Sequence, residues 1–305
     1  MTKKIIFVFA IFLASCTSNK ALKHPLDKSK SKTVVLENGL KVYLLSDPSF
    51  NVSAASVSVE VGSLDNPDDR QGLAHFLEHM LFLGTEKYPD VDEYSSYLKT
   101  YGGYSNAYTA SDHTNYQFQV LPDGFEGALD RFSQFFISPL FTEEYTAREV
   151  NAVNSEHQKN KLNDNWRQFR VSSLFAKEGH PERKFGTGNL ETLGDITREE
   201  LIRFYRQHYS ANRMGVALLS THTLEEMESW CRQYFSSIKN HNLDRNKYDP
   251  NFLEKKETFR LIQIDPVKDV RNLNLLFSLP ATRHLYKSKP GRQFGFILGY
   301  EGKGS

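Results

Sequence analysis

Two histidines and a glutamate interrupt an otherwise apolar run, and this combination constrains the chain more than any other feature. The run covers residues 72–83, and its ionisable members are His75, Glu78 and His79. The apolar side chains recur at helical spacing and Gly84 is a suitable C-cap, so the sequence predicts a buried helix. Because positions four apart share a helix face, His75 and His79 can direct both imidazoles to one point, where a metal ion could bind.

These three side chains have two interpretations when they are considered alone. Buried histidines are often held by hydrogen bonds, and a short His-x-x-Glu-His pattern also arises by chance. A carboxyl group among apolar side chains is costly, however, unless it is paired or lies beside a cation. In the metal interpretation Glu78 lies beside the same point and is available to take a proton from water. The motif alone leaves both interpretations open.

The composition is that of a globular protein. The 305 residues are enough for one large domain or two modest ones, and a formal net charge of +1 gives no support to a nucleic-acid partner. Gly186 and Gly188 lack the strand–turn–helix context of a dinucleotide site, and the sequence contains no P-loop. Cys231 follows a tryptophan in a helix-like run and is predicted to be an inert core thiol.

The N-terminus resembles the signal of a bacterial lipoprotein. Two lysines precede a short apolar stretch, residues 5–13, which is too short for an ordinary membrane-spanning helix. Ala-Ser-Cys follows, so we expect residues 1–15 to be removed and Cys16 to carry lipid at the start of a tether, residues 16–32. The predicted location is a bacterial membrane, outer rather than inner, facing the periplasm. The alternatives are a plain cleaved signal and a buried N-terminal strand.

Strand-like and helix-like patterns alternate along the rest of the chain. The predicted strands share a short alternation of apolar with polar or small side chains, or a short apolar run, and they cover residues 33–36, 40–44, 55–61, 104–109, 115–120, 214–219 and 273–279. The predicted helices share helical periodicity and capping residues, and they cover residues 72–83, 92–101, 124–136, 142 to beyond 156, 197–208, 223–238 and a short stretch after Pro290. Residues 159–195 are predicted to be irregular, and His113 is predicted to lie in a turn rather than to bind metal.

The domain organisation follows from these elements. We expect a domain over residues 33–240, a polar linker over residues 241–256 and an incomplete second domain over residues 257–305. One strand and one helix cannot bury a core of their own, so the sequence is expected to be a fragment or a truncated relative of a longer protein.

A resemblance to a known family strengthens the metal interpretation. Residues 72–85 closely resemble the inverted zinc motif and its surroundings in the pitrilysin/insulysin family of zinc peptidases. That family takes its third ligand from a glutamate seventy-seven residues after the second histidine, and the corresponding residue here is Glu156. Residues 148–157 around it also resemble the family, and the likeness extends from about residue 36 to the end. It implies an α+β fold, with an antiparallel-rich mixed sheet packed against helices as in the pitrilysin and mitochondrial processing peptidases.

The resemblance also implies roles for individual residues. His75, His79 and Glu156 would bind one zinc ion, and Glu78 would be the general base that activates water. Glu149 would support a zinc-binding histidine. On a helix, Glu149 and Glu156 are two turns apart and share a face. Without the resemblance, both would be taken for ordinary solvated glutamates.

Substrate binding is implied in the same way. Peptides or small unfolded proteins would add as a strand to residues 104–109, with contacts from Asn106, Ala107 and Phe82. Long family members have a second half that contributes to substrate binding, and none of that half is present in this sequence. A missing C-terminal half or a partner subunit is therefore expected. The competing hypothesis is a non-catalytic relative that acts as a binding or scaffold module.

Overall fold

The structure is a computed structural model that describes residues 23–250, 252–253, 261–277 and 282–302. The predicted signal segment, Cys16 and the first part of the predicted tether lie outside the described residues. Within the described residues, no helix combines the length and the apolar character needed to cross a membrane.

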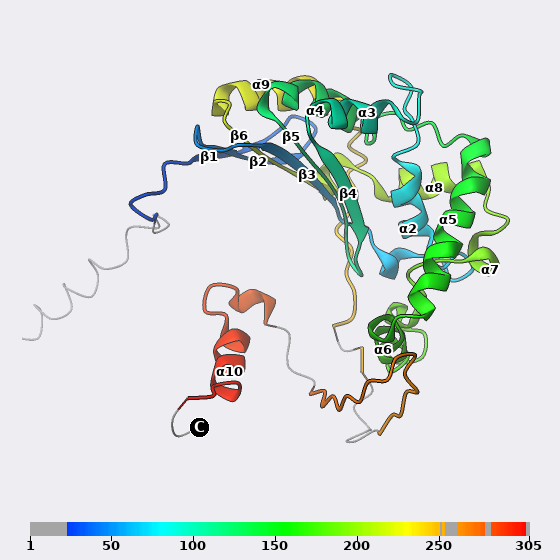
Figure 1. Cartoon of the computed structure of the whole chain (residues 1–305). Helices are drawn as coiled ribbons and strands as arrows, with labels where there is room; N and C mark the ends of the chain where they lie inside the picture. Colours follow the sequence, from blue (N-terminus) through cyan, green and yellow to red (C-terminus); the bar gives the residue numbers. More distant parts are fainter. Residues whose placement is uncertain (1–22, 251, 254–260, 278–281, 303–305) are drawn as a thin grey trace, which may run out of the picture.

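Six strands in the described part of the chain form one mixed sheet in the order β1-β2-β6-β3-β5-β4 (Figure 1). Their bounds are β1 Lys30–Val35, β2 Lys41–Ser46, β3 Ser53–Val59, β4 Tyr104–Thr109, β5 Thr114–Val120 and β6 Met214–Ser220. Neighbouring strands are antiparallel except for β2 and β6, which are parallel. The predicted antiparallel-rich mixed sheet is therefore confirmed, and β4 is an edge strand.

The alternation in the strands explains why one face of the sheet is covered and the other is not. In β3, Val57 and Val59 are fully buried, whereas the intervening Ser56 and Ser58 are only partly covered. The covering helices are α3 Glu93–Thr100, α4 Phe125–Gln134 and α9 Leu224–Phe235, which lie side by side across one face (Figure 1). Cys231 lies fully buried on α9, and burial raises the pKa of its thiol to about 12, in agreement with an inert core thiol.

A second group of helices lies beyond the β4 edge (Figure 1). Its members are α2 Leu73–Met80, α5 Glu143–Lys161, α6 Asp164–Ser173, α7 Leu190–Leu193 and α8 Arg198–His208. The predicted helix over residues 72–83 is thus confirmed, but it is three residues shorter at its C-terminal end. Phe82 and Leu83 donate to the carbonyls three residues earlier, and Gly84 follows with a φ of 87°.

Two predictions made from the sequence are wrong, one beyond β4 and one near the C-terminus. Residues 159–195 were expected to be irregular, yet they contain the whole of α6 and α7. The only buried residue of α6 is Ser173, so its sequence has no apolar stripe to reveal it. Its visible signal is Asn163, whose side chain accepts a hydrogen bond from the Asn165 backbone N–H.

The strand predicted over residues 273–279 is the second error. Residues 273–277 form no strand, and Leu273 and Phe277 are each 82% exposed. No neighbouring strand in the described residues pairs with this segment, so the backbone hydrogen bonds that a strand needs are missing. Residues 278–279 lie outside the described part. The short helix expected after Pro290 is present as α10 Pro290–Leu298.

Candidate metal centre

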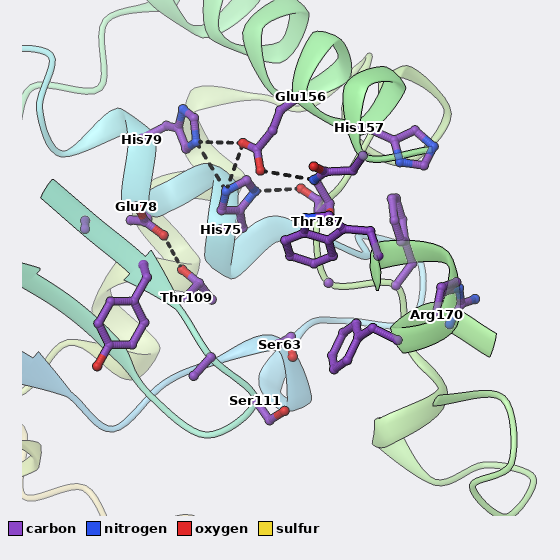
Figure 2. Close-up of a pocket in the computed structure, with 18 of the residues that line it drawn as sticks. Ser63, His75, Glu78, His79, Thr109, Ser111, Glu156, His157, Arg170 and Thr187 are labelled. Carbon is purple, nitrogen blue, oxygen red and sulfur yellow. Dashed lines mark hydrogen bonds and ion pairs between the residues drawn. The ribbon is translucent and has the colours of Figure 1, made fainter. Parts of the chain in front are cut away.

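Side chains from two helices converge at the β4 edge. His75 and His79 lie on α2 and Glu156 lies on α5, and one ligand atom of each falls within 4.8 Å of the others. The two imidazole Nε2 atoms are 3.3 Å apart, and the Glu156 Oε2 atom lies 3.5 Å from one and 3.7 Å from the other (Figure 2). Three potential ligand atoms therefore face one point, and the two imidazoles meet there as the spacing of the histidines predicts.

The far side of each imidazole is also held, which fixes the atoms that face the common point. His75 Nδ1 lies 2.8 Å from the Thr187 carbonyl oxygen, and His79 Nδ1 lies 3.2 Å from Glu149 Oε1. A carbonyl oxygen only accepts hydrogen bonds, so the Nδ1 atom of His75 carries the proton and its Nε2 offers a lone pair. Glu149 selects the same tautomer in His79. Both rings are thereby oriented as metal-binding histidines usually are.

The helical geometry of α5 places both glutamates. Glu149 and Glu156 are two turns apart on one face, so one carboxylate reaches the outer nitrogen of His79 and the other reaches both inner nitrogens. Asn160, one turn further, lies 3.3 Å from Glu156 Oε1 and orients that carboxylate. The sequence-predicted ligands and the predicted supporting glutamate are thus brought together.

Glu78 is the third carboxylate of the cluster. Only 6% of this residue is exposed, and its Oε2 accepts a 2.6 Å hydrogen bond from the Thr109 hydroxyl. Burial raises the pKa of the Glu78 carboxyl above its ordinary value, whereas His75 and the Thr109 hydrogen bond act in the opposite direction. A carboxylate with a raised pKa is a better proton acceptor than an exposed one.

The cluster as a whole favours a cation. Burial lowers the pKa of His79, but the hydrogen bond and charge of Glu149, together with Glu78 and Glu156, outweigh it and raise the pKa overall. Two imidazole nitrogens and one carboxylate oxygen are a donor set used by catalytic zinc sites, which keep a further position for water or substrate. The residues present therefore fit a zinc ion.

The cluster opens into a pocket of about 1210 Å³. One wall is the edge strand β4, and the opposite side is formed by α6 and by residues 184–187. The predicted substrate-binding residues Asn106, Ala107 and Phe82 all line this pocket. β4 pairs only with β5 in the described residues, so its outer edge is free to accept another strand.

His113 lies outside this cluster. It sits in the turn between β4 and β5, where its Nδ1 is 2.8 Å from Asp112 Oδ1. The prediction that it is a turn histidine is confirmed.

Sequence reasoning missed two positions at the centre. Thr187 contributes a backbone carbonyl, for which no side-chain pattern exists, and its only signal was the glycine on either side of it. Thr109 contributes a hydroxyl from within a correctly predicted strand. Alternation shows which face a strand residue occupies but not which distant group it meets.

Comparisons with known proteins identify the family to which the chain is similar. Two successive family models match the chain: "Insulinase (Peptidase family M16)" over residues 41–178 and "Peptidase M16 inactive domain" over residues 195–305. Insulin-degrading enzyme from Homo sapiens is 44% identical over 294 residues, which cover 94% of this chain and 29% of that protein. The A-factor-processing enzyme of Saccharomyces cerevisiae is 42% identical over 291 residues, which cover 93% of this chain and 28% of that protein.

A solved structure supports the same conclusion. The crystal structure of pitrilysin superposes with a TM-score of 0.73 at 35% identity, covering 76% of this chain and 25% of the other. The fold and the convergent His, His and Glu side chains define a metallopeptidase domain. The chain belongs to the insulinase (M16) family of zinc metallopeptidases and corresponds to its N-terminal part. It spans about 30% or less of the length of the relatives named here.

Proposed function

We propose that this chain binds one zinc ion and forms the catalytic centre of an endopeptidase that hydrolyses peptides or small unfolded proteins. The observation that supports this most directly is the convergence of His75, His79 and Glu156, with the Glu78 carboxylate beside them. Membership of a zinc metallopeptidase family supports the choice of metal and reaction.

The chain's own residues divide the chemistry between them. His75, His79 and Glu156 would hold the ion, which when bound supplies a Lewis acid for water and for the peptide carbonyl. Glu78 accepts the proton of the attacking water and then delivers it to the departing amine. Glu149 fixes the ring of His79 and raises its basicity.

Substrate binding is proposed at the edge strand. An extended peptide would pair with the free edge of β4, so that Asn106 and Ala107 meet its backbone and Phe82 meets a side chain. Pairing of this kind requires an unfolded segment, which restricts substrates to peptides and unfolded chains.

The proposal extends to partners and location. Because the chain spans under a third of its relatives, we propose that a second half, on the same polypeptide or on a partner subunit, adds to the substrate contacts that β4 makes. The lipoprotein-like N-terminus supports an exported enzyme, anchored through lipid on Cys16 to a bacterial membrane and facing the periplasm.

The test compares Glu78→Gln with Glu144→Gln in the chain that starts at residue 17. Glu144 is an exposed glutamate in the first turn of α5 and has no part in the pocket. We expect both variants to bind one zinc ion per chain, because neither removes a ligand. Cleavage of a quenched fluorescent peptide should fall about 100-fold or more in Glu78→Gln and stay unchanged in Glu144→Gln.

Two results would contradict the proposal. Wild-type chain with stoichiometric zinc and no cleavage that depends on Glu78 would instead support a non-catalytic binding module. Absence of zinc binding in the wild-type chain would refute the assignment of the three ligands.

A further inference from the structure

The carboxylate of Glu78 is held from one side only. Its Oε2 accepts the hydrogen bond from Thr109, and no other hydrogen bond to either carboxylate oxygen is found among the described residues. Oε1 is therefore left for the water that Glu78 would deprotonate. A buried carboxylate needs such a donor, because a charged group that is shielded from water and lacks a hydrogen-bond partner destabilises the fold.

The donor itself is fixed by the sheet. Thr109 is the last residue of β4 and lies opposite Thr114 of β5, and the two hydroxyl oxygens are 3.4 Å apart. The Thr114 hydroxyl donates to the Val61 carbonyl at 2.8 Å, so its own proton is committed. The Thr109 proton is then free for Glu78, and the β-branched side chain has little freedom to turn away.

This arrangement joins the general base to the strand that would receive the peptide. Asn106 and Ala107 lie three and two residues before Thr109 on the same edge strand. A peptide paired along β4 would hold the backbone of Thr109 and, through it, the hydroxyl that orients Glu78.

We infer that Thr109 is a positioning residue: it fixes one oxygen of Glu78 and ties the orientation of the general base to the substrate-binding strand. The inference rests on the proposed function, because it assigns Glu78 the role of base. A purely structural threonine in a strand would be replaced by valine without loss, since valine has the same shape and a high strand propensity.

The first experiment measures peptide cleavage by zinc-loaded chain carrying Thr109→Val or Thr109→Ser. Valine removes the donor, so kcat should fall about 10-fold to 100-fold with little change in KM or in zinc content. Serine keeps the hydroxyl and should retain kcat within about threefold of wild type. The control is Thr100→Val, an exposed threonine on α3 whose hydroxyl donates to the Ser96 carbonyl of the same helix, and it should behave as wild type.

The second experiment does not depend on activity. The melting temperature of the full chain is measured with zinc removed by a chelator, for wild type, Thr109→Val, Glu78→Met and the double variant. Thr109→Val should lower it by about 3–6 °C when residue 78 is glutamate, because the buried carboxylate loses its donor. With methionine at position 78 the same change should cost less than about 1 °C, since no carboxylate remains to be satisfied.

The inference is overturned if Thr109→Val keeps wild-type kcat, if serine is as impaired as valine, or if the two substitutions have additive effects on the melting temperature. If the wild-type chain shows no Glu78-dependent cleavage, the proposed function fails. The melting-temperature cycle then decides separately whether Thr109 and Glu78 are coupled. Should valine disturb the strand, Thr109→Ala enters the same cycle in its place.

Discussion

Two glycines determine how closely the loop that holds His75 approaches α2. Gly72 precedes the helix with a φ of 93°, and a Cβ added to it would lie 2.2 Å from the Gly188 Cα. Only a residue without a side chain permits this approach. Thr187, next to Gly188, can then accept a hydrogen bond from His75 Nδ1 through its carbonyl oxygen.

We therefore expect Gly72→Ala to lower the free energy of unfolding by at least about 2 kcal/mol, through strain and a backbone clash. It should also weaken zinc binding, because the loop must move away from His75. Denaturant unfolding of the chelator-treated chain and competition with a chromophoric chelator measure the two effects. Gly215→Ala is the control, since a Cβ there meets nothing within 4 Å. Equal stability of the two variants would contradict the argument.

At the same scale, the sequence predicts the histidines better than it predicts their partners. The i, i+4 spacing by itself places His75 and His79 together. Glu156 is 77 residues from His79 on another helix, and no local pattern could bring it there, so only the family spacing identified it. Thr109 and Thr187 depend on strand register and on a loop conformation, and apart from the glycines that flank Thr187 no residue pattern marks either position.

At the scale of elements, the segment expected as a linker makes many contacts. Within residues 239–253, Asn246 and Tyr248 donate to the Asp65 carboxylate at 2.6 and 2.8 Å. Further along, the Lys177 backbone N–H donates to the Phe252 carbonyl at 2.7 Å. Asp65 ends a short 3-10 helix, Ser63–Asp65, just before the loop that leads into α2. These hydrogen bonds therefore stabilise the segment that leads into the metal-binding helix α2.

Tyr248→Phe tests whether the hydrogen bond to Asp65 stabilises the fold. Loss of the hydroxyl removes a hydrogen bond to a charged carboxylate, which should cost about 1–2 kcal/mol of unfolding free energy. Residues 239–253 should also become more sensitive to a nonspecific protease under native conditions. Tyr286→Phe is the control, because that tyrosine is 65% exposed and far along the chain. An unchanged melting temperature and cleavage pattern in Tyr248→Phe would show that this hydrogen bond does not stabilise the protein.

Helices and strands were predicted well where a buried face produces a regular spacing of apolar residues in the sequence. The alternation predicted for β3 is present, and the helix predicted over residues 197–208 is α8, which begins with a capping box at Thr197. α6 was not predicted because Ser173 is its only buried residue. A strand over residues 273–279 was wrongly predicted because an apolar run resembles a buried strand even where no neighbouring strand pairs with it. Burial, rather than local propensity, separates these cases.

For the whole molecule, the position of β6 defines the smallest unit that can fold. β6 pairs with β2 on one side and β3 on the other, and its Val216 and Leu218 are buried in the core. The match to the first family model ends at residue 178, well before this strand. Without β6 the sheet is divided, and two strand edges with their apolar side chains are uncovered.

We therefore expect residues 23–194 alone to remain unfolded or to aggregate, and residues 23–253 to fold and bind zinc. Circular dichroism, cooperative thermal unfolding and zinc stoichiometry compare the two pieces. A cooperative, zinc-binding 23–194 piece would show that β6 is dispensable and that the sheet can rearrange without it.

The parallel pairing of β2 with β6 also has a consequence during synthesis. Lys41 meets Gly215 and Ser46 meets Ser220, so the middle of the sheet joins segments made at opposite ends of this unit. A ribosome must release the chain past residue 220 before that junction can form, and until then β2 and β3 each have one unpaired edge. The nascent chain therefore presents two open strand edges to chaperones until β6 has been synthesised.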